Sequence, residues 1–278
     1  MATLACFHAH PDDEAIATAG VLAKAKALGH RTIVVFATRG ELGEVPEWLG
    51  PDETLGELRT REAETACAIL GVDRVEWLGY RDSGVEDDDR NHDHDTFHSA
   101  PLDDAAGSLA AILRTEQVDV LTVYDENGNY GHPDHIKVHE VGYRAAELAR
   151  TPLVYETTID RDFVVASMRD SGAEFPEGIE IPDPEEMNLG MPAARITTEV
   201  DVSAFATAKR AAMAAHASQI NETSFFLQMP EDRFGEVFGR EWFIRRGGPL
   251  PPAMRETDLF APLADRHTAA RVGATEHE

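Results

Sequence analysis

Short apolar runs alternate with segments of helical composition through the first 157 residues, and this alternation restricts the fold more than any other feature. The expected strands are residues 4–8, 31–37, 75–78, 118–124 and 153–157. The expected helices between them are residues 12–28, 54–70, 102–115 and 133–149. Parallel strands joined by helices of this length need right-handed crossovers that cover the sheet. The sequence therefore predicts the α/β class, with a Rossmann-like, largely parallel sheet and helices on both faces.

The alternation weakens after this point, and two acidic segments interrupt it. Residues 81–100 have little apolar content, and residues 174–192 contain four prolines and six acids with no basic residue, so both are expected to be surface loops. The elements expected beyond them are a strand at 195–202, an alanine-rich helix at 204–217 and a strand at 242–245. We expect residues 1–165 to form the metal-binding catalytic core, and residues 166–278 to form a smaller C-terminal region of the same domain that walls the pocket.

The charge balance excludes several classes of partner. With 25 basic and 51 acidic side chains, the formal net charge is −26. Duplex binding needs Lys and Arg to replace condensed counterions, and anionic membranes attract polybasic segments, so neither nucleic acid nor a membrane is an expected partner. A basic leader and an apolar run of about 18 residues are both missing, which favours a cytoplasmic protein. Cys6 and Cys67 are expected to be free, buried thiols.

One short motif, His-Pro-Asp, occurs twice, each time where an expected strand or its loop leads into a helix. It lies at residues 10–12 and again at residues 132–134. Proline is preferred in the first turn of a helix, because its missing N–H would have no partner there. In a parallel sheet such turns lie at the carboxyl edge of the strands, where ligands bind. Acidic side chains at this edge would repel a pyrophosphate, so the edge is suited to a cation.

The spacing of these residues predicts a metal site. His10 and Asp13 are three residues apart across a helix start, so both can bind one ion, and His135 supplies a third ligand. Two histidines and a carboxylate, with one position open to water, are typical of catalytic zinc, and ferrous iron suits the same ligands. Asp12 neighbours a ligand and is the expected general base. His132 lies one helical turn before His135 and is the expected donor to an oxyanion.

Several other histidines are expected to lie outside this site. His8 belongs to the first strand and should pack in the core. His135 and His139 have H-x-x-x-H spacing, but residue 136 is Ile where a zincin helix needs Glu. The histidines of the acidic loop, which should be solvated, are His92, His94 and His98. The sequence contains neither a G-x-S-x-G nucleophile elbow nor a recognisable Cys-His arrangement.

The two motifs and their surroundings resemble the LmbE/PIG-L family of zinc-dependent N-deacetylases. The resemblance rests on Ala-His-Pro-Asp-Asp-Glu at residues 9–14 and on Tyr-Gly-His-Pro-Asp-His at residues 130–135. The further similar segments are the glycine turn 40–44, the arginine segment 59–71, Arg-Asp-Ser-Gly at 81–84 and the late helix 209–219. The similarity is strongest to the actinobacterial branch of N-acetylglucosaminyl deacetylases, which includes deacetylases of mycothiol biosynthesis.

The resemblance implies a role for each matching residue. The implied metal ligands are again His10, Asp13 and His135. Asp12 is implied as the general base and as the acid that protonates the leaving amine. His132 stabilises the tetrahedral intermediate or acts as the acid, Tyr130 assists at the same oxygen, and Asp134 orients His132 or the metal ligands. The residues implied to hold the sugar are Arg59, Asp82 and Glu44.

The predicted function is the removal of an acetyl group from an N-acetylated amino sugar, of the N-acetylglucosaminyl type, by a metal-activated water. Two alternatives stay open. One is an amidase that cleaves a larger amide, such as a thiol S-conjugate of an amino sugar. The other is a non-hydrolytic nucleotide-binding protein, which the absence of G-x-G-x-x-G after the first strand disfavours. The expected partner is a small amino sugar, and the sequence leaves a monomer and a homo-oligomer both open.

Overall fold

The computed structural model describes residues 1–85, 88–170, 189–248 and 255–263. These residues contain a seven-stranded sheet with the order β3-β2-β1-β4-β5-β7-β6. The strands are β1 (Thr3–His8), β2 (Arg31–Phe36), β3 (Arg74–Trp77), β4 (Val120–Tyr124), β5 (Leu153–Thr158), β6 (Thr198–Asp201) and β7 (Arg240–Arg245). The first five strands run parallel, and β7 is antiparallel to both of its neighbours. The predicted α/β fold with a largely parallel sheet is confirmed.

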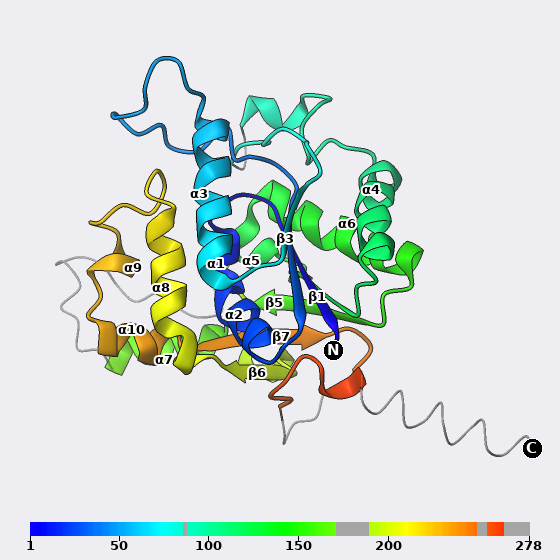
Figure 1. Cartoon of the computed structure of the whole chain (residues 1–278), viewed down its shortest axis with the longest axis vertical. Coiled ribbons are helices and arrows are strands. Elements are labelled where there is room, and N and C mark those ends of the chain that lie inside the picture. Colours follow the sequence, from blue (N-terminus) through cyan, green and yellow to red (C-terminus); the bar gives the residue numbers. More distant parts are fainter. Residues whose placement is uncertain (86–87, 171–188, 249–254, 264–278) are drawn as a thin grey trace, which may run out of the picture.

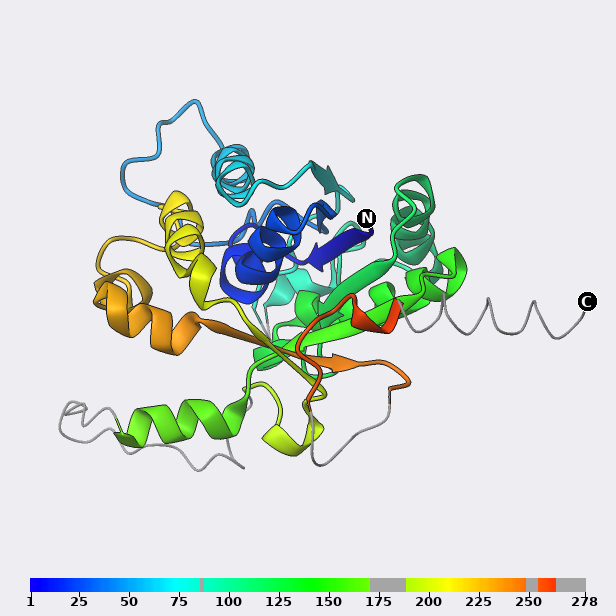
Figure 2. The same cartoon turned by 60° about the horizontal axis from the view of Figure 1, so that its bottom comes forward.

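Helices cover both faces of this sheet (Figure 1, Figure 2). They are α1 (Asp13–Ala17), α2 (Ala19–Ala27), α3 (Leu55–Leu70), α4 (Leu102–Thr115), α5 (Gly128–Gly131), α6 (Pro133–Ala149), α7 (Arg161–Asp170), α8 (Ala206–Ala215), α9 (Phe225–Gln228) and α10 (Glu231–Phe238). Helices α2, α3 and α8 share one apolar core with Leu4 and Cys6, whereas α4 and α6 share the other with Ala5 and Phe7. Successive residues of a strand point to opposite faces of the sheet, and an apolar core covers each face. Strand β1 is therefore buried along its whole length.

The ends of α3 follow from its local sequence. The Thr54 hydroxyl accepts the Glu57 N–H, and the Glu57 carboxylate accepts the Thr54 N–H, which is a capping box. Gly71 ends the helix with a φ of 73°, a conformation that favours glycine. The helix therefore forms where the sequence predicts it, and it brings Arg59 to Pro11 at the carboxyl edge of β1.

Residues 12–28 form two helices, so the prediction of one continuous helix there is wrong. The backbone leaves the helical conformation at Thr18, where φ is −136°. The Thr18 hydroxyl lies 2.9 Å from Nε2 of the buried His8. The change of backbone conformation at Thr18 separates α1 from α2, and its side chain points to His8 in the neighbouring strand. The alanine-rich composition of this segment does not reveal the break.

The acidic segment 81–100 is only partly a surface loop, which corrects the prediction for its two ends. Asp82, Ser83 and Phe97 are buried. The Phe97 ring packs edge-on against Phe7 of β1, with ring centroids 6.1 Å apart. Between its two buried ends, the described part of the segment 81–100 includes a short 3-10 helix, Asp89–His92. The apolar Phe97 therefore anchors the loop, and this anchor holds Asp82 and Ser83 against the sheet edge.

The C-terminal residues complete the same sheet. The predicted strands at 195–202 and 242–245 correspond to β6 and β7, and the predicted helix at 204–217 corresponds to α8. The predicted loop at 174–192 falls largely outside the described residues. The division of the chain between residues 165 and 166 stays a prediction. Among the helices that the structure describes, none is long and apolar enough to cross a bilayer.

Candidate metal and catalytic site

The two His-Pro-Asp turns meet at the carboxyl edge of the sheet. The first turn joins β1 to α1, and the second precedes α6, which has His132 as its N-cap. The strands that lead to them, β1 and β4, are parallel neighbours. The order of the strands reverses between these two, with β2 and β3 on one side and β5 on the other. Such a switch point is where open α/β sheets bind ligands.

The structure brings the three predicted metal ligands together. The Nδ1 atom of His10 lies 3.6 Å from Oδ2 of Asp13, and Nε2 of His135 lies 3.4 Å from the other oxygen, Oδ1. The side chain of Asp13 therefore lies between the two imidazoles. All three residues are buried, with exposed fractions of 7%, 8% and 1%. The Asp13 carboxylate is also held in place, because it accepts the backbone N–H of His10 at 2.8 Å.

The side chains that meet around His10 fit a divalent cation, and the tightest groups among them include His10 and His135 but not Asp13. Two groups of side chains place their candidate ligand atoms within 4.8 Å of one another: His10 with His132 and His135, and His10 with Asp82 and Asp134. His10 belongs to both groups. The Nδ1 atom of His135 is buried and has no hydrogen-bond partner among the described residues. Imidazole nitrogens together with carboxylate oxygens are the ligands that zinc and ferrous iron prefer.

Acidic side chains surround His10 on its second nitrogen as well. Its Nε2 atom lies 3.2 Å from Oδ2 of Asp134 and 3.5 Å from Oδ1 of Asp82. Burial by itself would lower the pKa of His10, but the carboxylates, Asp82 foremost, outweigh burial and raise that pKa well above its ordinary value. Burial would raise the pKa of Asp82, whereas the neighbouring His10 lowers it overall. Asp134 is fixed by Ser83, whose N–H and hydroxyl both donate to its carboxylate.

Asp12, the predicted general base, has an unusual backbone. Its φ is 103°, a left-handed conformation that costs a residue other than glycine about 1–3 kcal/mol. Nη2 of Arg59 donates to Oδ2 of Asp12 at 3.1 Å, and the Asp12 N–H donates to Oε2 of Glu14 at 3.0 Å. Burial raises the pKa of Asp12 to about 6, against the opposing charge of Arg59. Arg59 thus holds the Asp12 carboxylate, and Glu14 holds the backbone of the same residue.

His132 and Tyr130 lie over the same cluster. The His132 ring is 4.7 Å from that of His10 and 5.2 Å from that of His135, between ring centroids. Its Nδ1 atom accepts the N–H of Asp134 at 3.2 Å and so caps α6. Burial, and then the neighbouring histidines, lower the pKa of His132 to about 4. Tyr130 is half exposed, and its hydroxyl lies 3.4 Å from Nε2 of His135.

The three predicted sugar-binding residues occupy different positions. Arg59 is buried and donates to the carbonyls of Gly40 and Pro11 as well as to Asp12. Asp82 is buried beside His10 and accepts the backbone N–H groups of two loop residues, Leu42 and Gly84. Glu44 is exposed, and its backbone pairs with the side-chain amide of Gln219. The structure therefore gathers Arg59 and Asp82 at the metal cluster, whereas Glu44 lies in a neighbouring loop.

Sequence reasoning missed several residues that support the site. Tyr124, at the end of β4, stacks on the His135 ring with centroids 4.4 Å apart. Its hydroxyl also lies 2.9 Å from Nδ1 of His8, which is buried and outside the cluster. Ser83 and the buried pair of Glu14 and His216 are further examples. Glu14, Ser83 and His216 lie inside segments that resemble the family, but the sequence analysis gives them no role.

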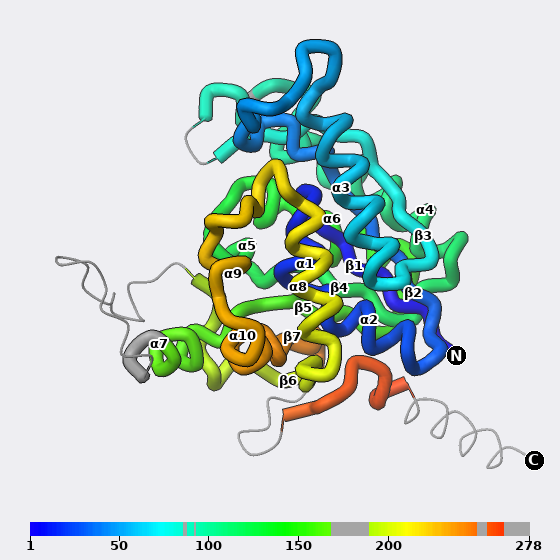
Figure 3. Tube along the Cα trace, turned by 60° about the vertical axis from the view of Figure 1, so that its left-hand side comes forward, coloured from blue at the N-terminus to red at the C-terminus, as the bar shows by residue number. Residues whose placement is uncertain are grey.

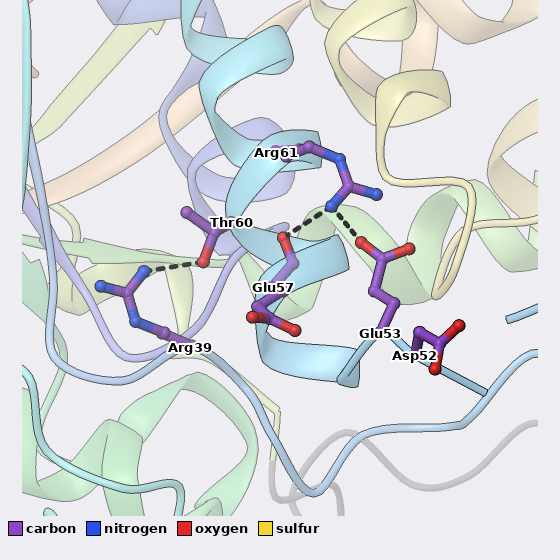
Figure 4. Close-up of a pocket in the computed structure, with 6 residues that line it drawn as sticks. All are labelled: Arg39, Asp52, Glu53, Glu57, Thr60 and Arg61. Atoms are coloured by element: carbon purple, nitrogen blue, oxygen red, sulfur yellow. Dashed lines mark hydrogen bonds and ion pairs between the residues drawn. The ribbon is translucent and has the colours of Figure 1, made fainter. Parts of the chain in front are cut away.

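A separate surface pocket of about 470 Å³ lies near the start of α3 (Figure 4). Its lining residues are Arg39, Asp52, Glu53, Glu57, Thr60 and Arg61. Figure 4 shows that its arginines are engaged within the pocket: Arg39 donates to the Thr60 hydroxyl, and Arg61 pairs with Glu53. None of the predicted metal, catalytic or sugar-binding residues lines this pocket. The histidine cluster, which contains the candidate metal ligands and the candidate base, is therefore the candidate site.

Comparisons of sequence give a family and named relatives. Residues 5–146 match the family model described as "PIG-L: GlcNAc-PI de-N-acetylase". A 1D-myo-inositol 2-acetamido-2-deoxy-alpha-D-glucopyranoside deacetylase from Thermobispora bispora is 38% identical over 295 residues, which cover 92% of this chain and 97% of the relative. The protein of the same name from Thermomonospora curvata is 37% identical over 286 residues, which cover 92% and 95%.

Solved structures share the fold. The N,N'-diacetylchitobiose deacetylase from Pyrococcus horikoshii matches with a TM-score of 0.58 and 23% identity, over 87% of this chain and 83% of that chain. A conserved protein from Thermus thermophilus matches with a TM-score of 0.56 and 22% identity, over 92% and 100%. The family model spans both His-Pro-Asp turns, and the relatives align along nearly their whole length, so this chain belongs to the PIG-L family.

Proposed function

We propose that this protein is a metal-dependent deacetylase that releases acetate from an N-acetylglucosaminyl-inositol, the type of compound in the names of its relatives. The observation that carries the proposal is the buried cluster of His10, Asp13 and His135 at a ligand-binding sheet edge. Amide hydrolysis needs a polarised carbonyl, a base that deprotonates water and an acid for the leaving amine. The cluster and the side chains around it offer a group for each task.

His10, Asp13 and His135 would hold the ion. Zinc is the metal that we propose, because two imidazoles, one carboxylate and an open position are its usual catalytic ligands, and ferrous iron is the second choice. A bound ion of this kind supplies Lewis-acid polarisation of a carbonyl and makes water acidic near pH 7. Asp134, which Ser83 holds, contacts His10 and would fix the orientation of its ring.

Asp12 is the residue that we propose to move the proton. Arg59 binds Oδ2 of this carboxylate, which leaves Oδ1 as the atom that takes a proton from the attacking water. The same oxygen then gives the proton to the departing nitrogen, because a group that acts as the base in one step acts as the acid in the next. The strained backbone of Asp12 keeps the carboxylate near the cluster while Asp13, the next residue, contacts both imidazoles.

His132 is proposed as the donor to the developing oxyanion. Its Nδ1 accepts the N–H of Asp134, so Nδ1 carries no proton in that contact and Nε2 is the protonated nitrogen of the neutral ring. A preorganised N–H of this kind stabilises negative charge on a tetrahedral intermediate. The Tyr130 hydroxyl, half exposed above His135, is proposed to assist at the same oxygen. Sugar contacts with Arg59, Asp82 and Glu44 remain part of the proposal.

The release of primary amine from N-acetylglucosaminyl-inositol tests this function. The wild-type protein, loaded with zinc or with ferrous iron, should release amine, and a chelator should stop the release until metal is restored. The rival substrate, tested in parallel, is a larger amide of the amino sugar, in which a thiol S-conjugate replaces the acetyl group on nitrogen. Faster cleavage of that conjugate would replace the deacetylase with the larger-amide hydrolase. If the metal-loaded protein releases amine from neither substrate, the proposed hydrolysis is refuted, and the nucleotide-binding alternative becomes the leading one.

A further inference from the structure

The end of α8 reaches the first catalytic motif through a buried ion pair. Nε2 of His216 lies 2.6 Å from Oε1 of Glu14, and neither side chain is exposed to solvent. His216 follows α8 directly, and Glu14 belongs to α1. Figure 3 shows α8 lying along α1 and α3, and both contacts are present in the structure. A residue of the C-terminal region thus binds the motif that contains Asp12 and Asp13.

The second oxygen of Glu14 holds the backbone of Asp12. Oε2 of Glu14 accepts the Asp12 N–H at 3.0 Å, so one carboxylate joins His216 to Asp12. On its other side, Arg59 donates to the Pro11 carbonyl and to the Asp12 carboxylate. A φ of 103° is unfavourable for aspartate, so the surrounding contacts must maintain it. Without Glu14, the Asp12 N–H would lose this partner, and fewer contacts would oppose a rotation of the peptide that moves the carboxylate.

Residues other than His216 attach the segment after α8 to the rest of the molecule. Two residues later, the N–H and hydroxyl of Ser218 donate to the carboxylate of Glu62 in α3, at 2.8 and 2.6 Å. The next side chain, Gln219, pairs with the backbone of Glu44. The segment is therefore anchored on α3 and on the 40–44 turn independently of His216. This separation lets the two buried contacts, His216–Glu14 and Ser218–Glu62, be tested against each other.

We propose that Glu14 and His216 are positioning residues for catalysis: His216 orients the Glu14 carboxylate, which in turn holds Asp12 in the conformation that places its own carboxylate at the metal cluster. The inference rests on the proposed function, since it assigns a purpose to the position of the proposed base. The Glu14 carboxylate is bonded to His216 and to the Asp12 N–H rather than to a proposed metal ligand, so loss of the pair should affect proton transfer and spare metal binding. A base displaced by about 1 Å can lose about 100-fold in rate.

The test compares His216→Asn with His216→Gln. Both amides are polar and smaller than or similar to imidazole, but only glutamine is long enough to donate to Glu14 from near the former Nε2 position. His216→Asn should lower kcat on N-acetylglucosaminyl-inositol by about 10- to 100-fold, with KM and zinc per chain unchanged. His216→Gln should restore most of kcat. Ser218→Ala is the matched control, which lowers the urea midpoint and leaves kcat unchanged.

Three results would overturn the proposal. The first is a kcat for His216→Asn within about twofold of wild type; the second is an equal loss of kcat in Ser218→Ala, which would mean general loosening of the segment. The third is loss of zinc in His216→Asn. A crystal structure of His216→Asn gives a readout without activity, because Asp12 should leave the positive φ region. A wild-type protein that binds zinc and is inactive would refute the proposed function, and that crystal structure would still decide whether His216 positions Asp12.

Discussion

At the scale of single residues, the adjacent acids Asp12 and Asp13 have different partners. Asp13 lies between two imidazoles, whereas Asp12, on a backbone with positive φ, turns toward Arg59. Two consecutive carboxylates on an ordinary helical start would point in directions fixed by helix geometry. The left-handed residue changes the direction of the chain between them. The proposed roles, Asp13 as ligand and Asp12 as base, would follow from this local conformation.

Replacing Asp12 tests that division. Asp12→Ala should keep its metal, because Asp13 and the two histidines are untouched, and should lose about 10²- to 10⁴-fold in turnover, the usual contribution of a positioned base. The measurements are kcat on N-acetylglucosaminyl-inositol and metal per chain on the same preparation. Turnover equal to wild type would remove Asp12 from the proposed role. Loss of the metal together with activity would instead make it part of the metal site.

The two cysteines should be inert in the folded protein. Burial raises the pKa of Cys6 to about 12 and raises that of Cys67 well above its ordinary value. The thiolate is the reactive form, and a raised pKa means that it forms only at high pH, so both thiols stay protonated at about pH 8. A disulfide reagent such as DTNB should label neither in the native protein at that pH and both in urea. Rapid labelling without urea would contradict the buried positions.

Single residues also show what could be predicted from sequence. Local features were sufficient to predict that His10, Asp13 and His135 lie close together, because two short motifs at strand ends in a parallel sheet must meet at one edge. The contact between Glu14 and His216 was not predictable, because it joins residues 202 positions apart in sequence and neither type announces its partner. Arg59 was recognised by its surroundings, but only the structure shows its guanidinium on Asp12.

At the scale of elements, a buried ion pair joins α8, β7 and α2. Nζ of Lys209 lies 2.6 Å from Oε1 of Glu241, with exposed side-chain fractions of 2% and 3%. The Glu241 carboxylate also accepts the N–H groups of Gly20 and Val21, each at 2.8 Å, at the start of α2. A negative charge at this end of a helix is favourable. The C-terminal elements are therefore fastened to the helix that follows the first catalytic turn.

Breaking this pair should destabilise the whole protein. Lys209→Ala leaves Glu241 buried without its cation, which costs about 3–5 kcal/mol of unfolding free energy. Arg233→Ala is the control, because Arg233 pairs with Glu236 at an exposed position and its loss should cost about 0–1 kcal/mol. Urea unfolding of both variants measures the difference. Similar losses in the two variants would show that the α8–β7 junction does not depend on the buried pair.

The sequence predicted the order of most elements but not every boundary. The capping box at Thr54 and the stop at Gly71 define α3 locally, so its limits were predictable. Thr18, where the helix breaks, contacts His8, and the buried Phe97 packs on Phe7, and both contacts form only in the folded sheet. The position of β7 between β5 and β6 is set by pairing between distant segments, which periodicity within a strand does not encode.

At the scale of the whole molecule, the chain combines a parallel half with an antiparallel edge. The parallel strands form the switch point at which the metal cluster lies, and residues beyond β5 add β6 and β7 at one side of the sheet. Those later residues also supply His216, next to the first motif. A formal net charge of −26 is expected to repel polyanions, whereas a neutral N-acetylated sugar would meet no such barrier.

The measurement that tests the central claim most directly is a calorimetric titration of metal-free protein with Zn²⁺. The wild type should bind one ion per chain, and His135→Ala should bind it more than about 100-fold more weakly, since loss of even an outer contact costs about 10- to 100-fold. Asp82→Asn, from the other group of side chains around His10, should retain one tight site. Full affinity in His135→Ala together with loss in Asp82→Asn would contradict a site built from His10, Asp13 and His135.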